Sequence, residues 1–414
     1  MNSDIYVLGA GMVGISCALE LQRRGHRVTL VDRRGPGEET SSGNAGILSY
    51  SNVTPLASPA LWPRMHLLGL NLDNDLRLHY PHLPWLLPWF IRFLWRCRRD
   101  TYLRDGDAMA ALTRASIELH EQWIAEAGAD SLAIRNGGLK LYRDRASFER
   151  DALERELLER CGIRHRPLDA DGVYELEPDL KRIFVNGVLI EDTVSIRNPR
   201  KLCQAYAKCF ADAGGEILQA EAKSLRQSGT GWELVTGQGA RRTDKLVVCL
   251  GAWTPGLIGE LGYRNPLAIE RGYHTLLKPA DGKCLSRPIF DVDSGYVMSP
   301  MEMGYRVTSG SNIVHGETPP DPRQLARALP RVREAFPVDR VLLEVPWMGR
   351  RPSVPDSLPI IGPAPRHRNL WFAFAHSHMG FTMGPITGRL IANFIDGREQ
   401  PFSPAPCNPA RYLR

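Results

Sequence analysis

The fold is decided by the stretch Ile5-Tyr6-Val7-Leu8-Gly9-Ala10-Gly11-Met12-Val13-Gly14 near the start of the chain. A short apolar, β-prone run leads directly into glycines at the spacing G-x-G-x-x-G, and an amphipathic segment, residues 15–24, follows. Strand, glycine turn and helix therefore come in the order of a dinucleotide-binding unit. We expect Gly9 to allow the tight turn, Gly11 to let a pyrophosphate approach the backbone, and Gly14 to let helix and strand pack closely.

The residues after this helix complete the unit. Gly25 is placed to end the helix, and Arg27-Val28-Thr29-Leu30-Val31-Asp32 predicts a second strand that ends in an acidic residue. An acid at this spacing holds ribose hydroxyls, so Asp32 and the adjacent Arg33 are candidate nucleotide contacts. The phosphates would lie at the helix N-terminus, where free N–H groups and the helix dipole favour an anion.

The glycines alone do not choose between NAD and FAD, because both use the same first βαβ unit. Just past the second strand lies Thr40-Ser41-Ser42-Gly43-Asn44-Ala45-Gly46, a run of small residues whose backbone can approach a flat ring closely. An ordinary surface loop is the alternative interpretation of this segment.

The 414 residues are 43% hydrophobic and 24% charged, which is typical of a globular protein with two to three domains or two interleaved ones. The net charge of +6 comes from arginines scattered along the chain, so no nucleic-acid partner is expected. None of the eight cysteines forms a C-x-x-C pair, so we expect no metal site and mostly buried, reduced thiols.

The location is expected to be cytoplasmic. A strand is predicted from residue 4 onward, so no secretory signal is expected before it. No stretch approaches the ~20 uninterrupted apolar residues of a transmembrane helix.

Several segments, taken together with the glycine turn, resemble the D-amino-acid oxidase superfamily of flavoproteins. They are Thr40–Gly46, Val247-Val248-Cys249-Leu250-Gly251-Ala252-Trp253, Gly349-Arg350-Arg351-Pro352 and His376-Ser377-His378-Met379-Gly380. Within the superfamily the chain is similar to bacterial D-amino-acid and D-hydroxyproline dehydrogenases, in which Glu270-Arg271-Gly272-Tyr273-His274 and Pro300-Met301-Glu302-Met303-Gly304-Tyr305-Arg306 recur. The likeness covers nearly the whole chain.

The resemblance implies an α/β fold with two interleaved domains. A Rossmann-like FAD-binding domain, a parallel sheet with helices, would comprise residues 1–55, 198–258 and 345–414. A substrate-binding domain with a mixed or antiparallel sheet would comprise residues 56–197 and 259–344. The residues support this coarsely, because 245–250 is a fully apolar strand whereas 267–310 alternates short β runs with turns.

The chain departs from the family pattern at one place, where Ser309-Gly310-Ser311-Asn312 stands instead of the common Gly-x-x-Glu. Residue roles known in the family are therefore not transferred to this segment. Relatives with covalent flavin use a histidine near Gly43 or a cysteine near the C-terminal return to the domain, and neither is present here. The resemblance therefore implies non-covalent FAD. Its candidate contacts are Gly9, Gly11, Met12, Val13, Gly14, Asp32, Arg33, Ser41, Ser42, Asn44, Ala45, Gly46, Ile47, Gly251, Trp253, Gly349, His378, Met379, Gly380, Phe381 and Thr382.

Arg351 is the candidate that would hold a substrate carboxylate. Oxidation of an α-amino acid at flavin requires the Cα–H to point at N5, and a planar guanidinium fork is suited to fix the carboxylate. Pro352 favours an extended backbone at Arg351, and alternation along an extended segment turns Arg350 the other way. A surface arginine in a salt bridge is the alternative.

Four other residues are candidate catalytic or pocket residues. Tyr273, His274 and Tyr296 are predicted to close the substrate pocket, although aromatic residues in strands commonly belong to the core. His378 is a candidate for proton transfer, and His376 shares its side of an extended segment. Residues 385–396 predict a helix with Pro385 in its first turn, whose N-terminus could stabilise reduced flavin. No acid–base pair stands out, and hydride transfer from a neutral amine needs none.

Residues 85–99 hold three of the nine tryptophans, and Arg92, Arg96 and Arg99 follow at helical spacing. A basic face opposite an aromatic face is typical of a helix at a membrane surface. Peripheral contact with the inner membrane and packing over the substrate-binding domain both stay open.

The expected function is FAD-dependent oxidative deamination of a small D-amino or D-imino acid, with electrons passing to a quinone or another acceptor. Three alternatives remain at this point. They are a glycine or sarcosine-type amine oxidase using oxygen, the flavoprotein subunit of an electron-transfer assembly, and a pyridine-nucleotide dehydrogenase.

Overall fold

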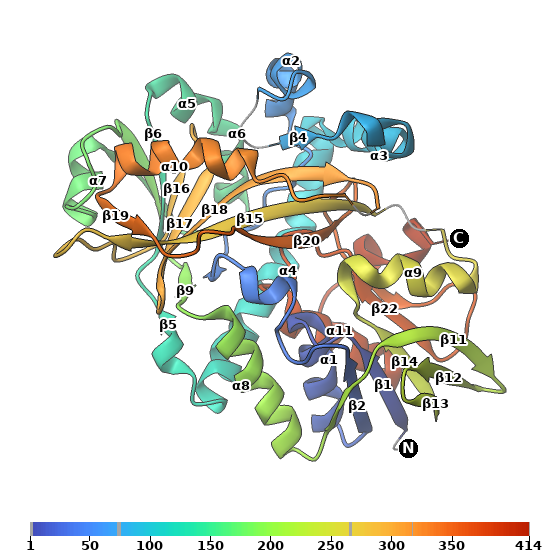
Figure 1. The fold of residues 1–414 in the computed structure, drawn as a ribbon. Helices are drawn as coiled ribbons and strands as arrows, with labels where there is room; N and C mark the ends of the chain where they lie inside the picture. The colour runs from blue at the N-terminus through green and yellow to red at the C-terminus, as the bar shows by residue number, and fades with distance from the viewer. Residues whose placement is uncertain (1–2, 73–75, 265–266, 317, 414) are drawn as a thin grey trace.

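Two β-sheets organise the chain in the computed structural model, which describes residues 3–72, 76–264, 267–316 and 318–413. One sheet has six strands in the order β10-β2-β1-β14-β22-β21, and the other follows the path β19-β15-β18-β17-β16-β6-β8-β7 with β20 and β4 attached. Figure 1 shows the six-stranded sheet at the lower right and the larger sheet across the upper half of the molecule. This arrangement confirms the predicted α/β fold.

The six-stranded sheet is parallel except for one edge strand. Its strands are β1 (Asp4–Leu8), β2 (Arg27–Asp32), β10 (Glu216–Gln219), β14 (Lys245–Val248), β21 (Ile360–Pro363) and β22 (Leu370–Phe374). β1 lies between β2 and β14, and both pair with it in parallel, whereas β21 pairs antiparallel with β22. Parallel strands are buried on both faces, which explains why the adjacent residues Val7 and Leu8, whose side chains face opposite sides of the sheet, are both fully buried.

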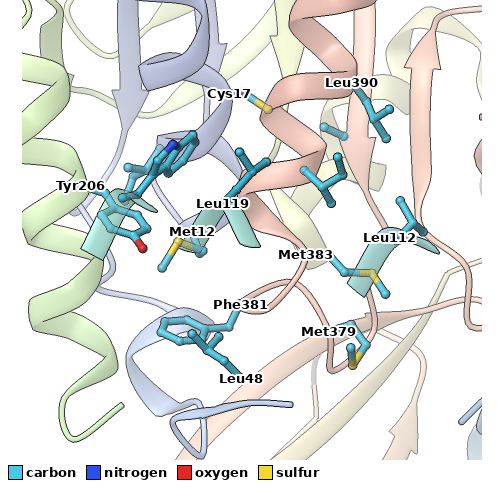
Figure 2. Packing of buried hydrophobic residues seen from close by; sticks show 14 of the residues in the cluster. Met12, Cys17, Leu48, Leu112, Leu119, Tyr206, Met379, Phe381, Met383 and Leu390 are labelled. Carbon is cyan, nitrogen blue, oxygen red and sulfur yellow. The ribbon is translucent and has the colours of Figure 1, made fainter. Parts of the chain in front are cut away.

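Two helices cross closely beside this sheet. The helix α1 (Met12–Arg23) begins three residues earlier than predicted. The helix α11 (Gly384–Asp396) ends at the predicted residue and is followed by Gly397, whose φ is +66°. A Cβ added to Gly388 would lie 2.4 Å from the Ser16 carbonyl oxygen, so the crossing requires a glycine there. Figure 2 shows side chains of the core around this crossing, among them Met12, Leu390 and Met383.

The larger sheet is mixed, and its long strands are antiparallel. Its strands are β4 (Leu76–Leu78), β6 (Gly138–Tyr142), β7 (His165–Asp169), β8 (Asn186–Ile190), β15 (Ala268–Pro279), β16 (Ile289–Asp291), β17 (Tyr296–Met301), β18 (Gly304–Val314), β19 (Val338–Val341) and β20 (Trp347–Ser353). The helix α10 (Arg323–Ala335) lies over the sheet at the top of Figure 1. β20 pairs with β15 in this sheet, although the predicted boundary at residue 345 assigns it to the flavin-binding segments. The domain boundaries stay a prediction.

Two small sheets and further helices complete the fold. The sheets are β11 (Ala222–Ser228), β12 (Gly231–Thr236) and β13 (Gly239–Thr243), and β3 (Ile47–Leu48), β5 (Ala133–Ile134) and β9 (Val194–Ile196). The helices are α2 (Met65–Gly69), α3 (Leu83–Arg96), α4 (Arg99–Glu126), α5 (Arg145–Arg150), α6 (Ala152–Arg160), α7 (Ala170–Leu176), α8 (Pro199–Asp212) and α9 (Thr254–Ile258).

The segment predicted as one basic and aromatic helix is divided between α3 and α4. Trp89 and Phe93 are buried, whereas Trp85 and Trp95 are 64% and 70% exposed. Arg96 forms ion pairs with Asp356 (3.1 Å) and Asp105 (3.4 Å), and Arg99 lies in α4 beside Glu156. The three arginines therefore do not form one basic face, and that part of the prediction is wrong. No helix among the described residues combines the length and apolar character needed to cross a bilayer.

Candidate active site

A cavity of about 1060 Å³ is lined by residues of both large sheets. This volume reaches the upper end of the range of about 300–1,000 Å³ for ligand pockets, as expected for a dinucleotide together with a small substrate. The wall includes the β1–α1 turn, most of the 39–47 loop, residues 249–253 after β14, parts of strands β15 and β20, and residues 376–382 except Met379.

The glycine turn has the geometry that its sequence predicts. Gly9 has φ of +100°, and a Cβ on Gly14 would lie 1.7 Å from the Gly9 carbonyl oxygen. Gly9 and Gly11 lie on the cavity wall, whereas Gly14 lies behind it. Ser41 accepts a hydrogen bond from the backbone N–H of Met12 at 3.0 Å, which joins the 39–47 loop to the start of α1.

Asp32 lies on the cavity wall and also fixes the turn. Its carboxylate accepts hydrogen bonds from the backbone N–H groups of Ala10 (2.8 Å), Arg34 (2.8 Å) and Gly35 (3.0 Å). The adjacent Arg33 lies over the Trp253 ring, 4.6 Å from its centroid. These contacts hold the predicted ribose region rigidly beside the cavity.

Arg306 of β18 holds the 39–47 loop by hydrogen bonds to its backbone. The sequence analysis did not identify this residue as part of the site. Its buried guanidinium donates hydrogen bonds to the carbonyl oxygens of Ser42 (2.9 Å) and Asn44 (2.5 Å). Burial lowers the pKa of Arg306 to about 10. The signal that could have found it is a cation in the middle of an otherwise apolar strand, Tyr305-Arg306-Val307.

Residues 375–382 form the wall before α11. Ala375 and Ser377 have positive φ values of 64° and 49°, a conformation that non-glycine residues rarely adopt. The buried Oγ of Ser377 has no hydrogen-bond partner among the described residues and lies on the cavity wall. His376 contacts the Thr387 hydroxyl at 2.9 Å, and burial lowers its pKa to about 3, so its ring is neutral.

His378 also lies on the wall, close to a charged pair. Burial lowers the pKa of His378, the Glu270 carboxylate opposes this shift, and the Arg351 cation adds to it. The lowered pKa favours the neutral imidazole more strongly than in an ordinary histidine.

Arg351 lies on the wall with its side chain 22% exposed, paired with Glu270 at 2.5 Å. A Cβ on Gly272 would lie 2.3 Å from Arg351 Nη2, so the guanidinium lies across this glycine. Arg350 also lines the cavity but lies toward Trp253, 5.8 Å from that ring centroid. The two side chains lie in different directions, Arg350 toward Trp253 and Arg351 toward Glu270, but both residues line the same cavity.

The three residues predicted to close the pocket, Tyr273, His274 and Tyr296, do not all line the cavity. Tyr296 lies on the wall, but Tyr273 and His274 do not. Tyr273 is buried in the apolar cluster on the other side of β15, where its hydroxyl accepts a hydrogen bond from the Asp321 N–H at 2.8 Å. His274 is covered by Trp347, whose ring stacks on it at 4.7 Å. The expectation that Tyr273 and His274 line the pocket is therefore wrong.

The other predicted cofactor contacts are placed as follows. On the wall lie Gly9, Gly11, Met12, Val13, Asp32, Arg33, Ser41, Asn44, Ala45, Ile47, Gly251, Trp253, Gly349, His378, Gly380, Phe381 and Thr382. Gly14, Ser42, Gly46 and Met379 lie behind it. Gly46 is pressed against the Ile196 carbonyl oxygen, 2.2 Å from its ideal Cβ, and Met379 is packed in the core shown in Figure 2.

The wall fits a flavin dinucleotide. Gly251 has φ of +54°, and a Cβ there would meet no atom within 4 Å, so backbone faces open space. The unpartnered Ser377 hydroxyl offers a polar contact near the other end. Five of the eight cysteines are buried, and burial raises the pKa of Cys249, the one cysteine on the wall among the described residues.

Residues 4–394 match the family DAO, described as FAD dependent oxidoreductase. The chain belongs to the DAO family. It is 33% identical to a D-amino-acid oxidase of Bradyrhizobium diazoefficiens and 29% identical to a D-amino acid dehydrogenase of Chromohalobacter salexigens, over 99% of each chain in both cases. The glycine oxidase of Geobacillus kaustophilus, at 22% identity with full coverage of both chains, has the same fold with a TM-score of 0.77. This DAO-family chain is therefore an FAD-dependent oxidoreductase.

Proposed function

We propose that the protein catalyses the oxidative deamination of a small D-amino or D-imino acid with non-covalently bound FAD. The observation that carries this proposal is the Arg351 guanidinium on the cavity wall, held by Glu270 and positioned over Gly272. A fixed guanidinium fork is suited to one carboxylate. Full-length relatives named D-amino-acid oxidase and D-amino acid dehydrogenase support the substrate class.

The cofactor would be held mainly by backbone. The Gly9–Val13 turn would contact the pyrophosphate, Asp32 the ribose, and residues 41–47, with Gly251 and residues 378–382, the remainder of the dinucleotide. When bound, FAD supplies the acceptor for the hydride that leaves the substrate Cα. Non-covalent binding is supported by the raised pKa of the Cys249 thiol, because the thiolate is the nucleophilic form.

The residues of the chain would bind and orient the substrate without an acid–base pair. Arg351 would fix the carboxylate, and the neutral His378 beside it could accept a proton from the substrate ammonium. Tyr296 would border the space for the side chain from β17. Hydrolysis of the imino product then needs only water.

The electron acceptor would be a membrane quinone, reached through exposed apolar side chains on α3 and on the segments that precede it. Trp85, Leu87, Ile91 and Trp95 lie on α3, and Trp62, Leu70, Leu72 and Tyr80 precede it. The Trp62 indole donates a hydrogen bond to the Cys97 carbonyl at 2.7 Å, which ties the loop before α2 to the end of α3. Exposed aromatic and apolar residues with Arg92 and Arg98 nearby suit a peripheral contact with anionic lipid.

The test is a reduction assay with purified protein across D- and L-amino acids, including D-proline and hydroxy-D-prolines. We expect yellow protein that releases intact FAD on acid denaturation and reduces a dye with D-substrates. Colour that stays with the precipitated chain would contradict non-covalent binding, and activity confined to L-amino acids would contradict the substrate class. A second arm compares oxygen with a quinone embedded in anionic liposomes. Reoxidation that is equally fast without liposomes would exclude the membrane acceptor.

A further inference from the structure

The carboxylate of Glu270 is buried beside Arg351, and both of its oxygens accept hydrogen bonds from protein groups. The two residues lie directly opposite each other in the β15–β20 register, and the Glu270 side chain is 2% exposed. Its Oε1 accepts hydrogen bonds from Arg351 Nη1 at 2.5 Å and from the Ser311 hydroxyl at 2.6 Å. Its Oε2 accepts one from the Ser353 hydroxyl at 2.7 Å. Three adjacent strands therefore supply one hydrogen-bonded cluster on the cavity side of the sheet.

Glu270 is suited to hold its neighbour rather than to move a proton. Burial alone would raise the pKa of Glu270, but the Arg351 cation and the two hydroxyls hold it below its ordinary value. A carboxylate offers about four acceptor positions, and three are occupied by protein groups. An ionised, nearly saturated carboxylate is a poor general base, and its effect on the reaction must pass through Arg351.

Gly272 provides the second half of the arrangement. It lies two residues after Glu270, and therefore on the same face of β15. The Nη2, Cζ and Nε atoms of Arg351 would lie 2.3, 2.6 and 3.2 Å from a Cβ at this position. The guanidinium thus lies across the one residue that leaves space for it. Within the described part of the chain, Nη1 is the one guanidinium nitrogen of Arg351 that has a hydrogen-bond partner.

We infer that Glu270 is a positioning residue, which fixes Arg351 through Nη1 so that the Nη2 and Nε edge is presented to the substrate carboxylate. A free arginine side chain would lose considerable rotamer freedom on binding its ligand, and a prefixed one loses much less. The inference rests on the proposed role of Arg351. It assigns the orientation of this side chain, and hence part of the substrate affinity, to a residue that need not contact the substrate.

The matched control is a second buried glutamate of the same kind. Glu177 is also fully buried, and it pairs with Arg287 at 2.9 Å and with Ser286, but it does not line the cavity. Glu177→Gln removes a charge from an equivalent cluster. It is expected to lower thermal stability and to leave KM unchanged.

The experiment is a double-mutant cycle with Glu270→Gln, Arg351→Ala and the two combined, measured on flavin-loaded protein. Glu270→Gln is expected to raise KM, and to weaken binding of propionate followed by flavin absorbance, by roughly tenfold with kcat much less affected. In the Arg351→Ala background the same change should add nothing. Independent, multiplying effects of the two changes would overturn the inference.

Two further measurements keep the test decisive if a variant is poorly stable. Gly272→Ala should mimic Glu270→Gln in KM and propionate binding, because a methyl group displaces the guanidinium. Guanidinium ion added to Arg351→Ala should restore part of the activity, and this rescue should be lost in the double variant. Rescue that is equal without Glu270 contradicts the inference alone. Arg351→Ala with the affinity of the parent contradicts the proposed function itself.

Discussion

At the Gly9–Gly14 end of the cavity the wall is backbone, whereas at the Arg351 end it consists of charged side chains that hold one another. The first end depends on the absence of side chains, since a Cβ on Gly14 would lie 1.7 Å from a carbonyl oxygen. The second depends on a buried ion pair and two hydroxyls. Added bulk should therefore damage the first end, and removed charge should damage the second.

The largest effect is expected from bulk in the glycine turn. Gly14→Val would force the Gly9 carbonyl away from α1 and separate helix from strand, so little folded protein should be recovered. Gly11→Val is the matched variant. Its Cβ would meet only the Ser41 hydroxyl at 3.3 Å, so the fold should survive while the pyrophosphate is blocked.

Soluble yield, thermal unfolding and flavin absorbance separate the two variants. Gly14→Val should give little soluble protein, no cooperative unfolding transition and no flavin absorbance. Gly11→Val should keep the yield and the unfolding transition of the parent but show no flavin absorbance. Yellow Gly11→Val protein would mean that the dinucleotide does not approach this backbone.

The next effect tests the charged end. Arg351→Ala should keep its flavin but lose kcat/KM by roughly 10- to 100-fold, because a hydrogen bond to a charged group is worth about 1.5–3 kcal/mol. Arg351→Lys should recover only part of the loss, since an ammonium has no planar fork. Arg350→Ala should be much milder, because Arg350 lies toward Trp253. Equal losses in the two alanine variants would reject Arg351 as the clamp.

The same comparison explains what the sequence could predict. The order of strand, glycine turn, helix and second strand is set by neighbours within one continuous segment, and it was predicted closely, although α1 begins three residues earlier than expected. The pairing of Glu270 with Arg351 depends on the register between two strands 81 residues apart, which no local pattern records. Tyr273 and His274 were misplaced because adjacent strand residues face opposite sides, and Trp347 from β20 covers the remaining one.

Other differences have the same cause. Arg306 supports the 39–47 loop because the fold brings β18 next to it, although Arg306 lies 262 residues from Asn44 in the chain. The prediction of one basic face on residues 85–99 was wrong because the helix ends at Arg96 and a new helix, α4, begins at Arg99. In addition, Arg96 forms ion pairs with Asp356 and Asp105. Helical spacing alone does not show which face is covered by distant residues.

Acid should destabilise the folded chain through two buried histidines, His376 on the cavity wall and His120 in α4. Burial holds the pKa of His376 at about 3 and that of His120 at about 4, both below the ordinary value near 6.5. The unfolded chain therefore binds more protons below about pH 6.5, and the free energy of unfolding falls by up to about 1.4 kcal/mol per pH unit for each group. Glu270, with its lowered pKa, stays ionised over the same interval.

Urea unfolding between pH 7.5 and 5.5 measures this slope. His376→Gln should make the slope shallower, and His66→Gln, a change at an exposed histidine outside the cavity wall, should leave it unchanged. An identical slope in wild type and His376→Gln would show that His376 is already protonated or is exposed in the folded protein.

The smallest effect is expected at Tyr273, directly next to Gly272 but on the other face of β15. Its hydroxyl accepts a hydrogen bond from the Asp321 N–H, so Tyr273→Phe should lower the free energy of unfolding by about 0.5–1.5 kcal/mol. Because the ring lies in the apolar cluster behind the sheet, flavin content, KM and the order of preferred substrates should not change. Gly272→Ala is the neighbouring contrast, with a raised KM. A change of substrate preference in Tyr273→Phe would mean that this side chain reaches the pocket. The substrate site would then include residues on both faces of β15.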